Sequence, residues 1–250
     1  MDAMKHRLCG LGILLGATLI AYPCGARAES GIEWSVTPYI WASTTRVDLS
    51  FRDTTVGGEI SFGDLLDTID SAFMINVEGG RGRWSVFADL TYLDTSDTDR
   101  RNLLSIDTRS KQTVLDAAVS WWPEGVGTPL SIFGGVRYSG FDDRYDFRLI
   151  QDGTLLASRR SEKDYYDALL GLRYGFQLSD RWSLLSHGDL SFGDSEGTFL
   201  LRALFAYTVG KRGQNNLVAG YQYKRAEFRD GDLTLDFDFQ GPVAGFNFRF

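Results

Sequence analysis

The chain has 250 residues, a formal net charge of −7 and a hydrophobic content of 43%. The acidic charge argues against nucleic acid or anionic lipid as a partner, because both are themselves negatively charged. After residue 22 no apolar run approaches the roughly 20 residues that a membrane-spanning helix needs. This excludes a helical membrane protein beyond that point.

The first 28 residues have the pattern of a cleaved signal peptide. Lys5 and Arg7 form a basic start, and residues 8–21 form an apolar core. Small residues at positions 26 and 28 then suit a signal peptidase. We therefore expect residues 1–28 to be removed and residues 29–250 to form a single exported domain.

Both cysteines, Cys9 and Cys24, lie within this expected leader. Lipid attachment at Cys24 is a weaker alternative, because residues 21–23 do not resemble a lipobox. The exported domain therefore lacks thiols, which excludes a disulfide scaffold and thiolate chemistry.

From residue 34 onward apolar and polar residues alternate with a period of two, which indicates strands whose faces meet different environments. In one such segment Val86 and Leu90 share one face, and Asp89 and Thr91 share the other. The pattern predicts ten strands: 34–51, 72–80, 84–94, a fourth ending at 121–122, 130–147, a sixth ending at 176, 182–190, 201–207, 217–224 and 233–250.

The connections alternate between short turns near Gly82, Gly125, Asp180 and Gly213 and long loops near Gly58, Asp99 and Gly153. Short periplasmic turns and longer outer loops are typical of transmembrane barrels, and an even strand number returns both ends to the periplasm. The prediction is an all-β fold: an antiparallel, up-and-down transmembrane β-barrel of about ten strands, with eight or twelve as alternatives. A soluble sandwich is the competing fold, since its strands also alternate.

The first predicted strand has Tyr39, Trp41 and Val47 on one face and Arg46 and Asp48 on the other. The two faces of this strand are therefore expected to meet different environments.

The first long loop contains a helical period. Phe62, Leu65, Leu66 and Ile69 are spaced i, i+3, i+4 and i+7, with Asp64 placed as an N-cap. We expect one short amphipathic helix that plugs the barrel mouth or lies on its rim.

The last strand ends on Phe246, Phe248 and Phe250. An aromatic residue at the end of an alternating strand looks like the sorting signal of bacterial outer-membrane barrels. Earlier in the strand the apolar residues, such as Phe237, have odd numbers, so they lie on the face opposite to Phe246, Phe248 and Phe250. A bulge is therefore expected between the two halves, at 241–242.

Ionisable residues occupy the face that points into the predicted barrel, and their two signs roughly balance. A barrel of about ten strands has an interior that side chains nearly fill. Opposite charges are expected to pair there, because an unpaired charge in a confined space is costly. The expected lumen charge network consists of Glu78, Asp89, Asp116, Asp167, Asp189, Arg137, Arg173, Arg202, Lys224 and Arg249.

This network is compatible with two functions. It closes the lumen of a structural barrel, or it lines a narrow, porin-like pore that passes small solutes.

His187 and Asp189 are two residues apart on one strand, so they share the inward face. A histidine oriented by a carboxylate can act as a general base, which makes an outer-membrane hydrolase an alternative function. No nucleophile stands at a recognisable spacing, and Ser186 points the other way. The prediction is therefore that the protein is not an enzyme.

A single histidine and no cysteine in the exported domain make a transition-metal site unlikely to form. Carboxylates near Asp99 are expected to be solvated, and no phosphate-binding glycine loop occurs. We expect no metal and no cofactor. The loops near Asp99 and Gly153 leave a third function open, that of an adhesin or binding protein.

Several segments resemble a widespread family of small proteobacterial outer-membrane β-barrel proteins, which share the general architecture of OmpW and porins. The matching segments are 37–41, 61–66, 83–85, 88–93, 187–189, 219–223 and 241–250. The chain departs from the family at 190–194, where the family tends to be glycine-rich. The resemblance implies an outer-membrane location and the barrel fold, and it carries no activity.

The partners that follow from this reading are outer-membrane lipid, including lipopolysaccharide, and the barrel-assembly machinery during insertion. The oligomeric state stays open.

Overall fold

The computed structural model describes residues 31–51, 54–101, 104–151, 153–210, 215–230 and 233–250. The expected signal peptide, residues 1–28, and the turn near Gly213 lie outside these residues. No helix in the described ranges is long and apolar enough to cross a membrane.

The described residues form one antiparallel sheet and one short helix, α1 (Phe62–Leu66). The strands are β1 (Glu33–Trp41), β2 (Thr44–Phe51), β3 (Thr54–Ile60), β4 (Ile69–Arg81), β5 (Trp84–Arg101), β6 (Leu104–Trp121), β7 (Leu130–Leu149), β8 (Leu155–Gln177), β9 (Trp182–Gly193), β10 (Gly197–Val209), β11 (Asn215–Asp230) and β12 (Leu233–Arg249).

The sheet closes into a ten-strand barrel, as the alternation predicted. Strands β4 to β12 follow one another in chain order, and β1 lies between β4 and β12. Strands β1 and β2 are two halves of the first predicted strand, interrupted at Ala42 and Ser43, and both pair with β12. At the other end of the molecule β3 adds to β2 as a further strand. The alternation did not reveal β3, because Gly57 and Gly58 remove side chains from its centre.

The predicted bulge in β12 is wrong. The register with β11 runs without a shift from Asn216↔Asn247 to Asp230↔Leu233. The irregularity lies instead in the partner strand, at the interruption between β1 and β2. A side chain on Gly241 would collide with the carbonyl oxygen of Ala42, so the close approach there requires glycine.

The apolar residues of β12 change from one face of the strand to the other, and a bulge is not the cause. Even-numbered residues of β12 point outward throughout. At its outer end Asp236 and Asp238 bond to Arg225 and Tyr223 on the outside of the barrel. Phe237, on the opposite face, contacts Phe228 inside it. The apolar face turns inward because this part of the strand extends beyond the lipid.

The first strand turns the face that carries Tyr39 into the barrel. Tyr39 is buried, and its hydroxyl donates to Asp89 on β5, so it points into the lumen. Its neighbour Ile40 is 67% exposed on the outer face. Tyr39 carries a polar group that the lumen can satisfy, whereas Ile40 carries none.

The outer surface of the barrel has an apolar band. Leu170, for example, is 57% exposed and Phe205 is 50% exposed. Exposing such side chains to water costs about 1.5–3 kcal/mol each, and a patch of this extent indicates a membrane or partner surface.

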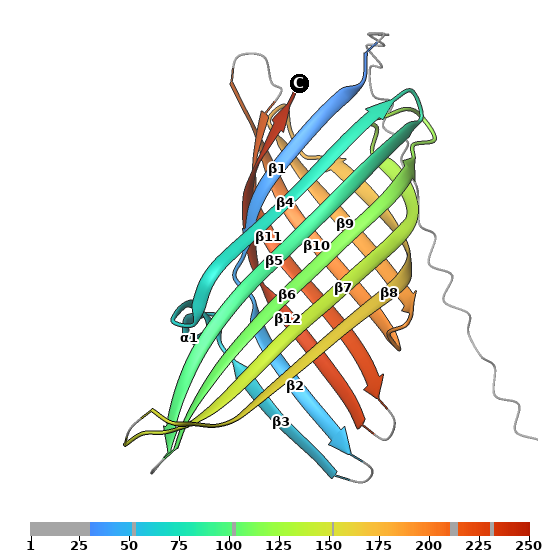
Figure 1. Ribbon diagram of the computed structural model, residues 1–250. Coiled ribbons are helices and arrows are strands. Elements are labelled where there is room, and N and C mark those ends of the chain that lie inside the picture. Colours follow the sequence, from blue (N-terminus) through green and yellow to red (C-terminus); the bar gives the residue numbers. More distant parts are fainter. Residues whose placement is uncertain (1–30, 52–53, 102–103, 152, 211–214, 231–232) are drawn as a thin grey trace, which may run out of the picture. The chain divides into compact units, whose positions relative to one another are not determined.

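Aromatic residues edge this band at both ends, as in transmembrane barrels. One belt contains Trp84, Trp121, Tyr174, Phe176, Trp182, Tyr207, Phe246 and Phe248, and the other contains Tyr138, Tyr166, Phe192, Phe199 and Tyr223. The C-terminus and the short β4–β5 turn lie at the first belt's end of the barrel (Figure 1). Gly82 closes that turn with a φ of 65°.

Several strands extend well beyond the second belt. Strands β7 and β8 have 20 and 23 residues, whereas about 9–11 suffice to cross a membrane. Pairing of β8 with β9 begins only at Asp167, and pairing of β5 with β4 ends at Thr95. The outer parts of β5 to β8 therefore form a four-stranded sheet with free edges, while β2 and β3 continue the sheet of β11 and β12 (Figure 1).

The helix α1 was expected to be a plug or a rim element. Ser61 is its N-cap, and Asp64 completes a reciprocal capping box instead of being the cap. None of its residues is buried, Leu66 is 54% exposed, and Ile69 belongs to β4. A helix with no buried side chain does not fill the lumen, so the plug assignment of Phe62, Leu65, Leu66 and Ile69 is corrected to a rim position.

Candidate functional site

Arg137 is the centre of the side-chain network in the lumen. It projects inward from β7, and only 1% of it is exposed. Its Nε and Nη2 donate to the two carboxylate oxygens of Asp116, each at 2.7 Å. Its Nη2 also lies 3.1 Å from Oδ1 of Asp189 on β9. One guanidinium thus joins three strands.

Asp189 extends this network to the histidine. Its Oδ2 lies 2.8 Å from Nε2 of His187, so the two residues are brought together as the spacing predicted. The imidazole also packs against Phe133, with ring centroids 5.1 Å apart. The pair is therefore enclosed by an arginine on one side and an aromatic ring on the other.

A second group of contacts crosses the lumen from β8 to β4 and β5. Arg173 bonds to Glu78 at 2.8 Å, and Glu78 accepts a bond from Ser85 at 2.6 Å. The Arg173 guanidinium lies 4.1 Å from the ring centre of Phe87, a favourable cation–π geometry. Phe87 and Phe133 meet edge to face at 5.2 Å.

A third group connects β1, β5 and β10. Tyr39 donates to Asp89 at 2.6 Å, and Nη1 of Arg202 lies 3.8 Å from the same carboxylate. Arg202 also bonds to Gln222 on β11. Because β5 and β10 are not neighbours, these contacts pass through the interior.

Two of the expected network residues, Asp167 and Arg249, have other surroundings, whereas Lys224 stays close to the network carboxylates. Asp167 lies opposite Arg137 in the register but accepts bonds from Ser191 and Ser195, fixing the β9–β10 turn. Lys224 faces Asp116, Asp189 and Asp89 within electrostatic range.

Arg249 is the second of these residues. It is exposed, and its Nε donates to Asn247 at 3.1 Å. It lies at the end of β12, away from the carboxylates, so its assignment to the charge network is corrected.

An aromatic cluster lies inside the barrel near its outer mouth. Tyr165 and Phe228 rings are 4.7 Å apart, and Phe141 lies 5.6 Å from Phe228. Phe237 completes the cluster at 5.9 Å from Phe228. The alternation did not reveal this cluster, because a period of two predicts apolar residues on the outer face and does not show where a strand leaves the lipid. The lengths of the strands were the signal that could have revealed the cluster. Beyond the lipid, the apolar face of a strand can point into the barrel.

Among the described residues no group of histidine, cysteine and carboxylate side chains has a geometry suited to a metal ion.

Solved structures with a similar fold are outer-membrane barrels of different kinds. Ail, the attachment invasion locus protein of Yersinia pestis, in complex with a heparin analogue, has 12% identity and a TM-score of 0.40, covering 88% of this chain and 99% of that chain. The outer-membrane protease OmpT of Escherichia coli has 9% identity and a TM-score of 0.47, covering 88% and 97%. The beta domain of the Bordetella autotransporter BrkA has 12% identity and a TM-score of 0.37, covering 88% and 99%.

No family model and no curated protein matches the sequence. The resemblance to OmpW-like small barrels therefore stays a prediction. With TM-scores below 0.5, function has to be argued from the residues of this chain.

Replacing Arg137 by methionine is expected to destabilise the barrel by about 3–5 kcal/mol, because it leaves two carboxylates buried without their cation. Arg137→Lys is expected to lose less, since it keeps the charge but not the planar fork. The measurement is equilibrium urea unfolding in phospholipid vesicles, followed by tryptophan fluorescence.

Arg46→Met is the matched control, because Arg46 forms an exposed pair with Glu59. Its unfolding midpoint is expected to stay close to that of the wild type. Equal midpoints for Arg137→Met and Arg46→Met would show that the buried network does not hold the barrel together.

Proposed function

We propose that the protein is an outer-membrane β-barrel with a closed lumen and a structural role. The exposed apolar band and its two aromatic belts support the membrane location. Short turns at the end that carries the C-terminus, and long extensions at the other, support the orientation that is usual for outer-membrane barrels.

The observation that carries the closed lumen is the burial of Arg137 between Asp116 and Asp189. A guanidinium with 1% exposure is itself shielded from water by its neighbours. The phenylalanines Phe87 and Phe133 and the outer aromatic cluster add apolar barriers above and below. A narrow pore would require these contacts to open together.

Single-channel recording on residues 29–250 in a planar bilayer tests this proposal. The wild type is expected to give no stable conductance steps, because ion-paired and aromatic side chains occupy the lumen. Heat-dependent gel mobility shows that the protein is folded, and a general porin reconstituted in the same way is the control. Reproducible steps of one size would contradict the closed lumen and favour the porin-like pore.

We propose that His187 has a structural role and is not a general base. Its ring is enclosed by Phe133 and bonded to Asp189, which is itself held by Arg137. The neighbouring cations Arg173 and Arg202 also face it. A general base must reach the proton it abstracts, and these neighbours fill the space that a substrate needs.

His187→Gln is expected to fold and to keep every property of the wild type, because glutamine can still donate to Asp189. Peptide and phospholipid hydrolysis by the two proteins in vesicles should be equally close to background. Hydrolysis by the wild type that the variant lacks would support the hydrolase alternative.

The second candidate function is binding through the outer part of β5 to β8. The observation that favours it is the length of β7 and β8, which extends about twice as far as a membrane crossing requires. A barrel with only a structural role does not need this sheet.

Replacing residues 144–160 by an Asn-Gly turn would shorten the β7–β8 hairpin while keeping the pair Asp143↔Ser161. If the outer sheet binds a host surface, cells that display this variant should lose adhesion to extracellular-matrix proteins at least tenfold compared with the wild type. Equal adhesion by wild type, variant and vector-only cells would eliminate this candidate.

A further inference from the structure

Three arginines stand side by side on the outer surface of β6, β7 and β8. Arg109 is directly opposite Arg144, which is directly opposite Arg160. Each lies six residues from an outward-facing residue of its own strand, namely Leu115, Tyr138 and Tyr166. Since alternate residues share a face, all three side chains point outward.

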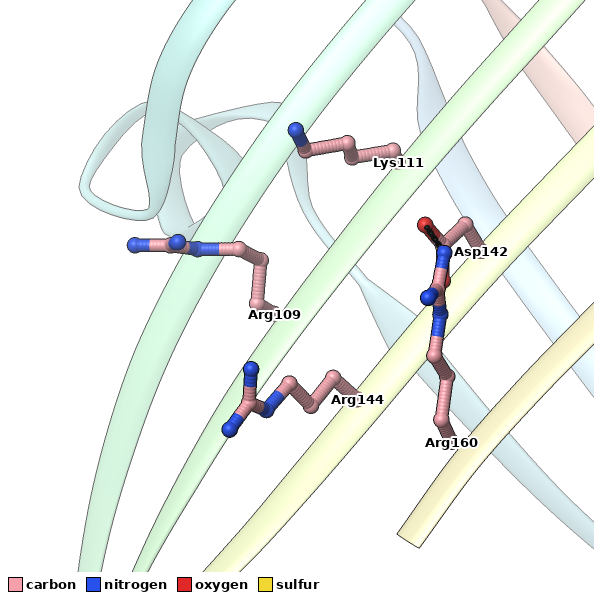
Figure 2. A pocket seen from close by; sticks show the side chains of 5 residues that line it. All are labelled: Arg109, Lys111, Asp142, Arg144 and Arg160. Atoms are coloured by element: carbon pink, nitrogen blue, oxygen red, sulfur yellow. Dashed lines mark hydrogen bonds and ion pairs between the residues drawn. The ribbon is translucent and has the colours of Figure 1, made fainter.

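A shallow hollow lies at this row, lined by Arg109, Lys111, Asp142, Arg144 and Arg160. Figure 2 shows the ends of Lys111, Arg109 and Arg144 projecting from adjacent strands around it. Four cations and one carboxylate therefore line the hollow, and Lys111 also lies 3.7 Å from Asp94.

The charges around the hollow are only partly compensated. Arg160 bonds to Asp142 through two contacts of 2.8 Å, and these hydrogen bonds lower the pKa of that carboxyl. Arg144 bonds to Asp146 at 3.2 Å. Arg109 forms no hydrogen bond or ion pair with any described residue.

Like charges directly opposite each other on neighbouring strands destabilise a sheet. A phosphate between Arg109 and Arg144 would relieve this repulsion. The guanidinium fork binds phosphate oxygens in pairs.

The position of the row relative to the lipid narrows the choice of anion. Six residues span about 20 Å along a strand, or about 15 Å along the membrane normal at a tilt of about 40°. Lys111 is two residues closer than Arg109 to the apolar band, and the flexible arginine side chains can extend back toward the aromatic belt. The row therefore faces the polar layer of the outer leaflet, where glycolipid phosphates lie.

We propose that Arg109, Arg144 and Arg160, together with Lys111, bind phosphate groups of the outer-leaflet glycolipid, lipopolysaccharide. The site rests on the proposed outer-membrane location but not on a closed lumen. The chain as a whole is acidic, so this binding depends on the local row and not on long-range attraction.

The test uses residues 29–250 refolded into phosphatidylcholine vesicles that contain either phosphorylated lipid A or its dephosphorylated form. The lipid A that stays with the protein after detergent extraction and size exclusion is measured. The wild type is expected to retain the phosphorylated form about tenfold better, because charged hydrogen bonds to phosphate are strong. Arg109→Gln/Arg144→Gln should remove this preference.

Arg225→Gln is the matched control, since Arg225 is also exposed on the outer face but pairs with Asp236 on another part of the barrel. It is expected to retain lipid A like the wild type. Equal loss in the control, or no preference in the wild type, would overturn the proposal.

Inorganic phosphate as a competitor distinguishes the two sources of the anion. Displacement of lipid A by millimolar phosphate would assign the site to the free ion and overturn the glycolipid. If the double variant does not fold, Arg109→Gln alone carries the test, because Arg109 has no described partner to lose. Conductance recordings on the same samples report on the lumen separately.

Discussion

Arg137 is held between Asp116 and Asp189 in the centre of the lumen, and the other interior contacts are arranged around it. A buried cation needs its anions, and each anion needs further donors to satisfy its remaining lone pairs. Asp189 finds one in His187, whose ring then packs against Phe133. Phe133 meets Phe87, which in turn supports Arg173. The chain of contacts crosses the barrel from one wall to the other.

The membrane imposes a reversal of polarity along each long strand. Within the lipid the apolar residues point outward and the charges inward, because lipid does not solvate charge and the lumen can pair it. Beyond the lipid both faces meet water, and apolar residues such as Phe228 and Phe237 gather inside instead. The outer face there carries alternating acidic and basic rows. One strand is therefore apolar on its outer face within the lipid and apolar on its inner face beyond it. The aromatic belt lies where the two patterns meet.

Interior and outer surface thus suggest different kinds of function. The interior contacts connect strands across the barrel, which favours a structural role for the barrel itself. The outer sheet of β5 to β8 has free edges and a row of arginines that its own carboxylates only partly compensate. Interactions with lipid or other molecules are expected on this sheet, where side chains are exposed and charge is left over.

The period of two by itself predicted about ten barrel strands, the direction of most side chains and most members of the charge network, because alternation records which face of a strand meets lipid. It also brought His187 and Asp189 together, since residues two apart share a face. It could not show that Tyr39 points inward, because an aromatic ring with a hydroxyl suits either face until Asp89 is seen beside it.

Only the tertiary structure showed where along each strand the apolar face turns from the outside of the barrel to the inside. The parity of β12 looked like a bulge in one strand, yet it reflects the level at which the strand leaves the lipid, and that level depends on the register of all its neighbours. The row of Arg109, Arg144 and Arg160 has the same origin. These residues are far apart in sequence, and pairing of three strands makes them neighbours. The composition of one strand and the spacing of its residues contain no information about which residues of neighbouring strands lie opposite each other.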